Sequence, residues 1–301
     1  MKNKTIFDVI IIGGSYSGLA AAMALGRSLR NVLIIDSEKP CNSQTSHSHN
    51  FLTQDGNTPK EISEIAKQQV LKYETIKFQK GIAISASKED FGFAVKTDSS
   101  KIFNSKKLIF ATGLKDIFPD IEGFAACWGI SILHCPYCHG YEVKNQETGI
   151  ISNGEIGFEF ARLISNWTKK LTIFTNGKTT FTEEQFEKLS SKNIQIIEKE
   201  ILKVNHSEGK IESLEFIDHS KVTIKAIYAR PNFEQHCKIP EDLGCEINEQ
   251  GLIKVDAFQK TTVKNVYACG DNSAMRSLAV AVSTGTMAGV IANKELIEEE
   301  F

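Results

Sequence analysis

Two cysteines separated by two residues, in the segment Cys135-Pro136-Tyr137-Cys138, form the part of this sequence best suited to chemistry. Thiols at this spacing can close a small disulfide ring or bind a metal ion. Thiol–disulfide exchange proceeds through the thiolate, so a working pair needs one cysteine with a lowered pKa. A position at the start of a helix favours the anion, and the second thiol can donate a hydrogen bond to it. The segment therefore predicts a redox-active dithiol.

Three other interpretations of this segment stay open. Cys-x-x-Cys followed by His139 is also the attachment pattern of c-type haem, whose chemistry belongs outside the cytoplasm. His134, the two cysteines and His139 offer four zinc ligands, but adjacent ligands at each end strain a tetrahedral site. Two structural thiols in a core are the simplest alternative. We favour the redox dithiol and predict no metal site.

Histidines flank the dithiol on both sides. His139 directly follows Cys138, and its ordinary pKa near 6.5 suits it to exchange a proton at neutral pH. His134 is a second candidate base, or a hydrogen-bonded turn residue. The remaining five cysteines are expected to be core or loop thiols; they are Cys41, Cys127, Cys237, Cys245 and Cys269.

The N-terminal segment has the pattern of a β-turn-α-β unit. An apolar run at residues 8–12 predicts a buried parallel strand, residues 19–25 predict a helix, and residues 31–36 predict a second strand. The turn between them resembles G-x-G-x-x-G, with Ser15 in place of the middle glycine. Asp36 ends the second strand, where a carboxylate can bind ribose hydroxyls. The unit predicts dinucleotide binding.

A second unit of the same type begins near residue 148, about 140 residues after the first, which suggests two nucleotide-binding domains rather than a solenoid. Its turn, residues 152–157, keeps fewer glycines. Thr175-Asn176-Gly177 follows the next strand and supplies neither the carboxylate expected for NAD nor the cation expected for NADP. The second turn therefore predicts an α/β scaffold more strongly than a nucleotide site.

Bulk composition excludes several classes of partner. The 301 residues include 35 Lys and Arg against 37 Asp and Glu, so no basic excess points to nucleic acid or to an anionic membrane. No apolar run approaches the roughly 18 residues that span a bilayer. Residues 1–8 lack the apolar stretch and cleavage site of a signal peptide. We expect a cytoplasmic protein without membrane contact.

Two further segments connect the chain to a family. Residues 108–113, Leu-Ile-Phe-Ala-Thr-Gly, and residues 266–271, Val-Tyr-Ala-Cys-Gly-Asp, resemble strand ends of flavoproteins with two dinucleotide-binding domains. Together with the first turn and the dithiol they occur in the order typical of low-molecular-weight thioredoxin reductases. The chain resembles that family over nearly its full length.

The resemblance implies an α/β fold with two Rossmann-like three-layer dinucleotide-binding domains, the second inserted into the first. Residues 1–115 and 241–301 would form a discontinuous FAD-binding domain. Residues 116–240 would form an NAD(P)-binding-like domain that carries the dithiol. A homodimer is also implied.

FAD is the cofactor that the resemblance implies. Asp271 would hold its ribityl chain, Asn42 and Asn50 belong to a stretch around the isoalloxazine, and the last helix begins beside the flavin at Ser277 and Leu278. The full expected set is Gly13, Gly14, Ser15, Tyr16, Ser17, Gly18, Asp36, Asn42, Asn50, Thr112, Gly113, Asp271, Ser277 and Leu278.

Catalytic roles are likewise implied for Cys135, Cys138 and His139. Cys138 would be the thiol next to the flavin, and Cys135 would exchange with the partner. His139 stands where the reductases have an acid–base Asp, and Thr175-Asn176-Gly177 stands where they have a basic cluster. The stretch 127–142 is more similar to a neighbouring branch that includes flavin-dependent dithiol oxidases. NADPH is therefore a possible but weakly supported second cofactor.

We predict an FAD-dependent thiol–disulfide oxidoreductase, similar to thioredoxin reductase, that passes two electrons through Cys135 and Cys138. Its partner would be a thioredoxin-like protein or a small dithiol or disulfide. Alternatives are a dithiol oxidase that uses oxygen or another acceptor, and a thioredoxin reductase supplied by ferredoxin. A non-catalytic flavin redox sensor is an alternative from a different class.

Overall fold

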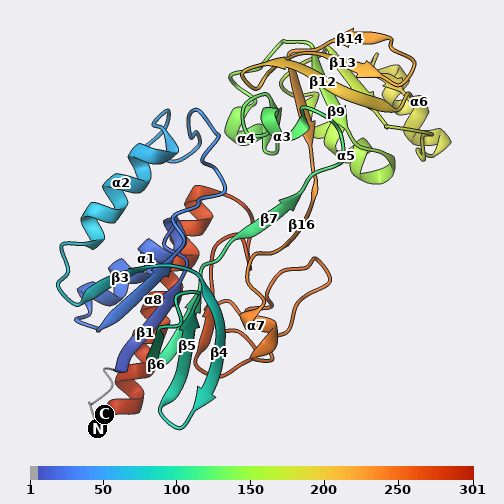
Figure 1. Ribbon diagram of the computed structural model, residues 1–301. Coiled ribbons are helices and arrows are strands. Elements are labelled where there is room, and N and C mark those ends of the chain that lie inside the picture. The colour runs from blue at the N-terminus through green and yellow to red at the C-terminus, as the bar shows by residue number, and fades with distance from the viewer. Residues whose placement is uncertain (1–5) are drawn as a thin grey trace. The chain divides into compact units, whose positions relative to one another are not determined.

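The computed structural model describes residues 6–301, which divide into two units (Figure 1). Unit 1 comprises Met1–Ser43, Lys60–Lys115 and Phe233–Phe301, and unit 2 comprises Gln44–Pro59 and Asp116–Asn232. The chain passes between the units along β7 (Leu114–Ile117) and β16 (Asn232–Gln235), which pair with each other. Each unit contains a parallel sheet with helices, so the α/β class predicted from the sequence is confirmed.

A seven-stranded sheet forms the middle of unit 1, in the order β3-β2-β1-β6-β5-β4, with β17 also paired to β6. Strands β1, β2, β3, β6 and β17 run parallel, while β4 and β5 are antiparallel additions at one side. The strands are β1 (Ile6–Ile12), β2 (Val32–Asp36), β3 (Ile76–Lys80), β4 (Ala83–Glu89), β5 (Gly92–Thr97), β6 (Ile102–Phe110) and β17 (Val266–Ala268).

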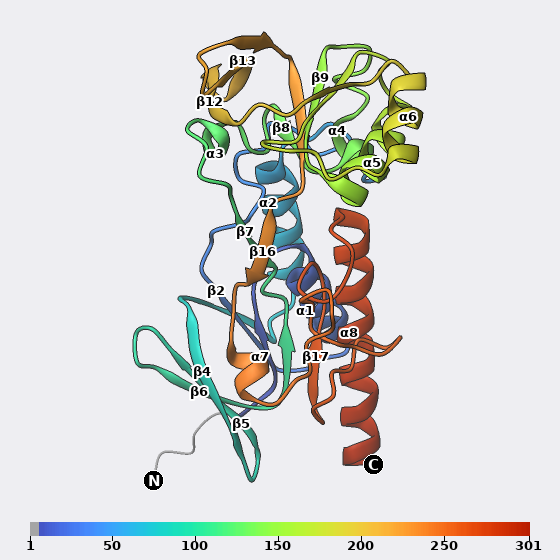
Figure 2. The ribbon, with the colours of Figure 1, turned by 90° about the vertical axis from the view of Figure 1, so that its right-hand side faces the viewer.

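Alternating side chains of β1 build one core on each face of this sheet. Ile10 and Ile12 enter one core, and Val9 and Ile11 enter the other. Helices α1 and α8 pack side by side over the second core, as Figure 2 shows. The helices of unit 1 are α1 (Tyr16–Arg27), α2 (Pro59–Val70), α7 (Ile239–Asp242) and α8 (Leu278–Glu300).

Buried Lys107 fixes the C-terminal half of α8 to the sheet. Its Nζ donates to Asn265 Oδ1 at 2.7 Å and to Glu299 Oε1 at 2.8 Å. The Tyr267 hydroxyl donates to Glu295 on the same helix. Because a buried charge is tolerated only with partners, this cluster fixes where α8 lies on the sheet. The position of α8 on the sheet in turn determines where Ser277 and Leu278, at the start of the helix, lie.

Unit 2 is built around a five-stranded parallel sheet in the order β11-β10-β9-β15-β8. A separate three-stranded antiparallel sheet, β12-β13-β14, covers one face. The strands are β8 (Ile132–Leu133), β9 (Thr148–Ile151), β10 (Leu171–Phe174), β11 (Gln195–Ile197), β12 (Ile201–Ser207), β13 (Lys210–Phe216), β14 (Lys221–Thr223) and β15 (Ala226–Ala229).

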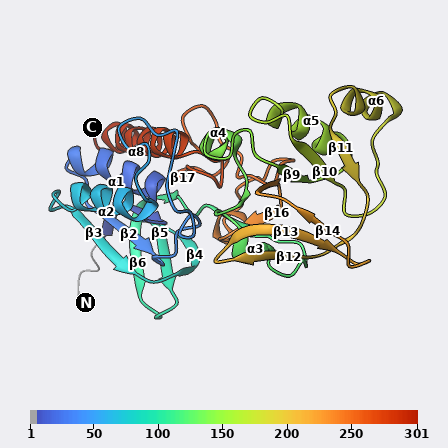
Figure 3. The ribbon, with the colours of Figure 1, turned by 90° about the horizontal axis from the view of Figure 1, so that it is seen from above.

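Helices cover the opposite face of the unit 2 sheet, so this unit also has three layers (Figure 3). Ile173 and Tyr228 point into the core under the helices, while the neighbouring Phe174 and Ile227 point toward the antiparallel sheet. The helices of unit 2 are α3 (Phe124–Cys127), α4 (Pro136–His139), α5 (Gly154–Ile164) and α6 (Glu183–Ser191). None of the helices within residues 6–301 is long and apolar enough to cross a membrane.

Candidate functional site

The first Gly-rich turn connects β1 to α1 with very close backbone approaches. Gly13 has a positive φ of 104°, and a Cβ there would lie 2.2 Å from the carbonyl oxygen of Ala111. A Cβ on Gly18 would lie 1.9 Å from the carbonyl oxygen of Gly13. Ser15 precedes α1 in extended conformation and its side chain does not cap the helix. A turn with glycines at its closest backbone approaches, at the start of a helix, fits a dinucleotide pyrophosphate.

Asp36 lies next to this turn at the end of β2. Its Oδ1 accepts a hydrogen bond from the Gly14 amide at 2.9 Å, and its Oδ2 accepts one from the Glu38 amide at 3.1 Å. These two amides fix the carboxylate beside the turn. The carboxylate is thereby positioned as a ribose ligand would be in a dinucleotide-binding unit.

Asn272 is a residue at this site that the sequence did not single out. Its side chain is fully buried and donates from Nδ2 to the carbonyl of Phe110 at 3.0 Å and to Thr112 Oγ1 at 3.2 Å. It thus joins the end of β6 to the turn that contains Asp271. Within the described chain its Oδ1 is buried without a hydrogen-bond partner. Its one signal in the sequence is that it follows the Gly-Asp pair.

The other residues expected to contact FAD fall into both units. Tyr16 and Asn42 meet in unit 1, where Asn42 Nδ2 donates to the Tyr16 hydroxyl at 3.5 Å. Ser277 immediately precedes α8, and Leu278 is its first residue. Asn50 instead belongs to the segment 44–59 of unit 2, where its amide donates to Asp55 Oδ1 at 2.7 Å.

The dithiol lies in unit 2 around the single turn of α4. Cys135 precedes the helix in extended conformation and Pro136 occupies its first turn. The Cys138 thiol donates to Cys135 Sγ at a sulfur–sulfur distance of 2.8 Å. A disulfide bond is about 2.05 Å long, so the two cysteines are free thiols within hydrogen-bonding distance. Oxidation of the two thiols to a disulfide therefore requires only a small local movement of the sulfur atoms.

The two cysteines differ in acidity. The hydrogen bond from Cys138 lowers the pKa of Cys135 to about 6, against the opposing effect of burial. Backbone N–H groups of Cys138 and Tyr137 and the charge of Arg230 act in the same direction. Donation of that same hydrogen bond, together with burial, raises the pKa of Cys138. At neutral pH Cys135 is therefore the thiolate and Cys138 the thiol.

Of the two causes expected for a lowered pKa, the hydrogen bond from the second thiol contributes most. The other, a helix dipole, has little support because α4 has only four residues, and macrodipole effects need aligned peptide units. Arg230, at the end of β15, also contributes and could not be identified from the sequence because the fold brings it close to Cys135.

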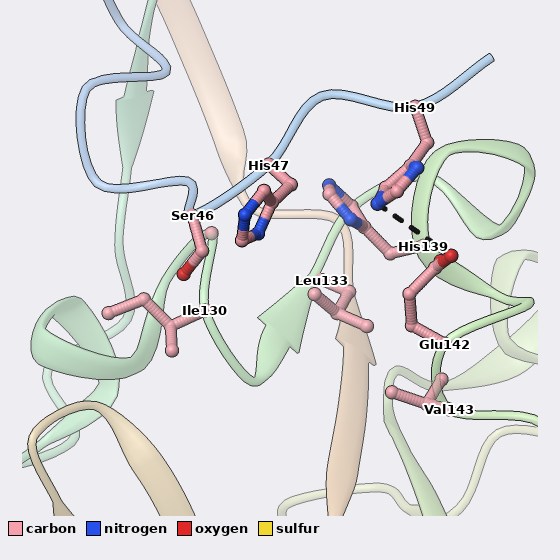
Figure 4. Close-up of a pocket in the computed structure, with 9 residues that line it drawn as sticks. Ser46, His47, His49, Ile130, Leu133, His139, Glu142 and Val143 are labelled. Carbon is pink, nitrogen blue, oxygen red and sulfur yellow. Dashed lines mark ion pairs between the residues drawn. The ribbon is translucent and has the colours of Figure 1, made fainter. Parts of the chain in front are cut away.

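His139, which follows Cys138 in the chain, lines a cavity of about 160 Å³ (Figure 4). Burial lowers the pKa of His139, and the charge of His49 lowers it further, while Glu142 raises it. The imidazole is consequently neutral at pH 7 and can accept a proton. The other lining residues are Ser46, His47, His49, Gly129, Ile130, Leu133, Glu142 and Val143. Within residues 6–301, no group of three or more His, Cys, Asp or Glu side chains could hold a metal ion.

Side-chain and backbone groups of the chain itself occupy the second Gly-rich turn, at the start of α5. Asn153 precedes α5, and its Oδ1 accepts hydrogen bonds from the amides of Gly154 at 2.8 Å and Thr180 at 2.9 Å. Its Nδ2 donates to the carbonyl of Lys178 at 2.9 Å. In the first helical turn, Glu155 Oε2 accepts from Gln185 Nε2 at 2.5 Å. An asparagine and a carboxylate thus occupy the helix start where a pyrophosphate binds in a Rossmann unit.

Comparison with known proteins gives consistent matches along the whole chain. The family described as "Pyridine nucleotide-disulphide oxidoreductase" matches residues 7–285. The thioredoxin reductase tcpT of Claviceps purpurea is 30% identical, covering 99% of this chain and 97% of the relative. The thioredoxin reductase sirT of Leptosphaeria maculans is 32% identical over 95% of this chain and 93% of its own. A putative thioredoxin reductase TrxB from Bacillus anthracis has a solved structure with a TM-score of 0.93 and 30% identity, covering 98% of this chain and all of that one.

Proposed function

Because this chain belongs to the pyridine nucleotide-disulphide oxidoreductase family and is an enzyme of the thioredoxin reductase type, we propose that Cys135 and Cys138 pass two electrons between its flavin and a partner dithiol or disulfide. The observation that carries the proposal is the dithiol itself, a thiolate and a thiol 2.8 Å apart. The family implies FAD, which when bound supplies a two-electron redox centre. The turn at Gly13–Gly18 and the carboxylate of Asp36 would hold it.

Cys135 is the residue we assign to exchange with the partner. Attack on a disulfide requires a thiolate, and its pKa of about 6 keeps Cys135 ionised at neutral pH. Cys138 keeps its proton until Cys135 has formed a mixed disulfide, and then displaces the partner. His139, which is half-buried and follows Cys138 in the chain, is the proposed proton acceptor.

A thioredoxin-like protein is the partner class that the thioredoxin reductase relatives imply. A small dithiol or disulfide is the alternative that the same chemistry allows. Tyr137 is the more exposed of the two residues between the cysteines. Its ring lies edge-on to the ring of Trp167, with ring centres 5.5 Å apart. An exposed aromatic side chain between the thiols offers an apolar surface for either partner.

A second candidate function, dithiol oxidation, is favoured by the closed second turn. Asn153, Glu155 and the backbone at Lys178 and Thr180 fill the helix start, and an acidic first turn disfavours a phosphate. We therefore propose that NADPH is not the electron donor at this turn. Electrons would enter from a substrate dithiol and leave to oxygen or another acceptor, or would enter from a protein such as ferredoxin.

Anaerobic mixing tests the identity of the electron donor. The flavin-loaded protein is mixed separately with dithiothreitol, NADPH and NADH, and the flavin absorbance is followed. We expect dithiothreitol to bleach the flavin and both nicotinamide nucleotides to leave it unchanged over the same period. Rapid bleaching by stoichiometric NADPH would show that the second turn is functional. Failure of all three while dithionite bleaches the flavin would refute the proposed path through the dithiol.

A further inference from the structure

A loop of unit 2 brings a second histidine to the cavity beside His139. Within the segment 44–59, the Ser48 amide donates to the Asn57 carbonyl at 2.8 Å, and the Gly56 amide donates to the Ser48 carbonyl at 2.9 Å. These bonds close the loop that carries His49. Its imidazole is about one-fifth exposed and points toward α4 (Figure 4). The loop therefore holds His49 in a defined place.

His49 lies between two carboxylates, one on each side of its ring. Its Nδ1 is 3.6 Å from Asp55 Oδ1, and its Nε2 is 3.7 Å from Glu142 Oε1. The Asp55 side chain is 65% exposed and the Glu142 side chain 40% exposed, so both carboxylates reach solvent. Each carboxylate can therefore pass a proton from the His49 ring to water.

The two imidazoles line the same cavity. The ring centres of His49 and His139 are 6.2 Å apart and the rings are perpendicular, at 89°. The cavity of about 160 Å³ has a mixed polar and apolar lining and has room for several water molecules. One water can bridge the rings. The titratable groups that line the cavity with His139 are His47 and His49 from the loop and Glu142 beyond α4.

The exchange reaction produces a proton that has to leave this site. A substrate dithiol, R(SH)₂, attacks the Cys135–Cys138 disulfide, forms an intramolecular disulfide, and leaves the two cysteines reduced. Two protons leave the substrate. Cys138 takes one, while Cys135 stays a thiolate at neutral pH because its pKa is about 6. The products are therefore the substrate disulfide, the Cys138 thiol, the Cys135 thiolate and one free proton.

We propose that His49 is a positioning residue that relays this proton from His139, through bridging water, to Asp55 and Glu142 at the surface. The inference rests on the proposed function, since it needs dithiol exchange at Cys135 and Cys138. His139 accepts the proton that the dithiol exchange releases. Repulsion between a protonated His139 and a protonated His49 favours transfer of a proton from His49 to the carboxylates at the surface. The reverse direction supplies a proton when the enzyme reduces a disulfide.

Substitution of His49→Gln tests the relay in the full flavin-loaded protein. Dithiothreitol is mixed rapidly with the oxidised enzyme, the reaction is quenched with an alkylating agent, and the reduction of Cys135–Cys138 is followed by mass spectrometry. We expect the rate constant of this reduction to fall about 100-fold, the lower end of the range for acid–base groups, with recovery on addition of imidazole. His219→Gln is the matched control, because His219 Nδ1 is likewise 3.5 Å from a carboxylate, that of Glu215.

Titration of His139 by NMR gives a readout that does not depend on turnover. His49→Gln should raise the pKa of His139, because a neighbouring positive charge is removed, and Glu142→Gln should lower it, because a negative charge is removed. Exchange at the wild-type rate in His49→Gln, or a loss that imidazole does not restore, would overturn the relay. If the wild-type disulfide is not reduced by dithiothreitol at all, the proposed function fails instead.

Discussion

Replacement of Cys135→Ser should reduce dithiol–disulfide turnover by about 10³-fold or more, because removal of a covalent nucleophile leaves only binding. A serine hydroxyl cannot form the mixed disulfide and is not ionised at neutral pH. Turnover is measured as substrate disulfide formed from dithiothreitol in air, or as thiol released from a thioredoxin-like disulfide.

Cys237→Ser is the control for this substitution. Cys237 is partly buried and packs against one core of unit 1. Burial raises its pKa to about 11, so this thiol is not ionised at neutral pH. Its replacement should leave turnover within about twofold. Retention of more than a tenth of wild-type turnover in Cys135→Ser would show that exchange takes place elsewhere.

Replacement of Gly18→Ala should remove FAD from the protein. The new methyl group would lie 1.9 Å from the carbonyl oxygen of Gly13, and neither backbone segment can move without separating α1 from β1. Overpacking of about 3 kcal/mol corresponds to roughly a hundredfold loss of affinity. Flavin content after purification is the measurement, with circular dichroism to establish that the apoprotein is folded.

Gly157→Ala provides the matched substitution in the second turn. A Cβ there would be 3.2 Å from the carbonyl carbon of Ser152, a contact that a few tenths of an ångström can relieve. The flavin content of this variant should equal that of wild type. Full flavin content in Gly18→Ala would mean that FAD is not held by the first turn.

The regular elements could be predicted because their patterns are local. Apolar runs predicted the strand at residues 8–12, observed as Ile6–Ile12, and the strand at residues 31–36, observed as Val32–Asp36. The spacing of the two cysteines likewise identified the dithiol. Helix α5 begins at Gly154, inside the turn expected at residues 152–157, because Asn153 caps it.

The parts of the site that could not be predicted depend on contacts between distant residues. His49 and His139 lie 90 positions apart, and only the loop bonds of the segment 44–59 bring them to one cavity. The role of Asn153 depends on Thr180, whose amide donates to Asn153 Oδ1 at the start of α5. Arg230 affects Cys135 because β15 lies beside β8 in the sheet. None of these pairings leaves a periodic pattern in the sequence.

Trapping of the mixed disulfide in a Cys138→Ser variant tests most directly whether Cys135 exchanges with the partner while Cys138 resolves the product. The variant is incubated at pH 7 with a small disulfide such as oxidised glutathione, then digested without reductant and mapped by mass spectrometry. The serine hydroxyl can donate the hydrogen bond that the Cys138 thiol donates to Cys135, so Cys135 should attack glutathione and form one mixed disulfide, which persists because no second thiol displaces it. The predicted result is a single glutathione adduct on Cys135. An unmodified Cys135, or an adduct on another cysteine in its place, would contradict the assignment.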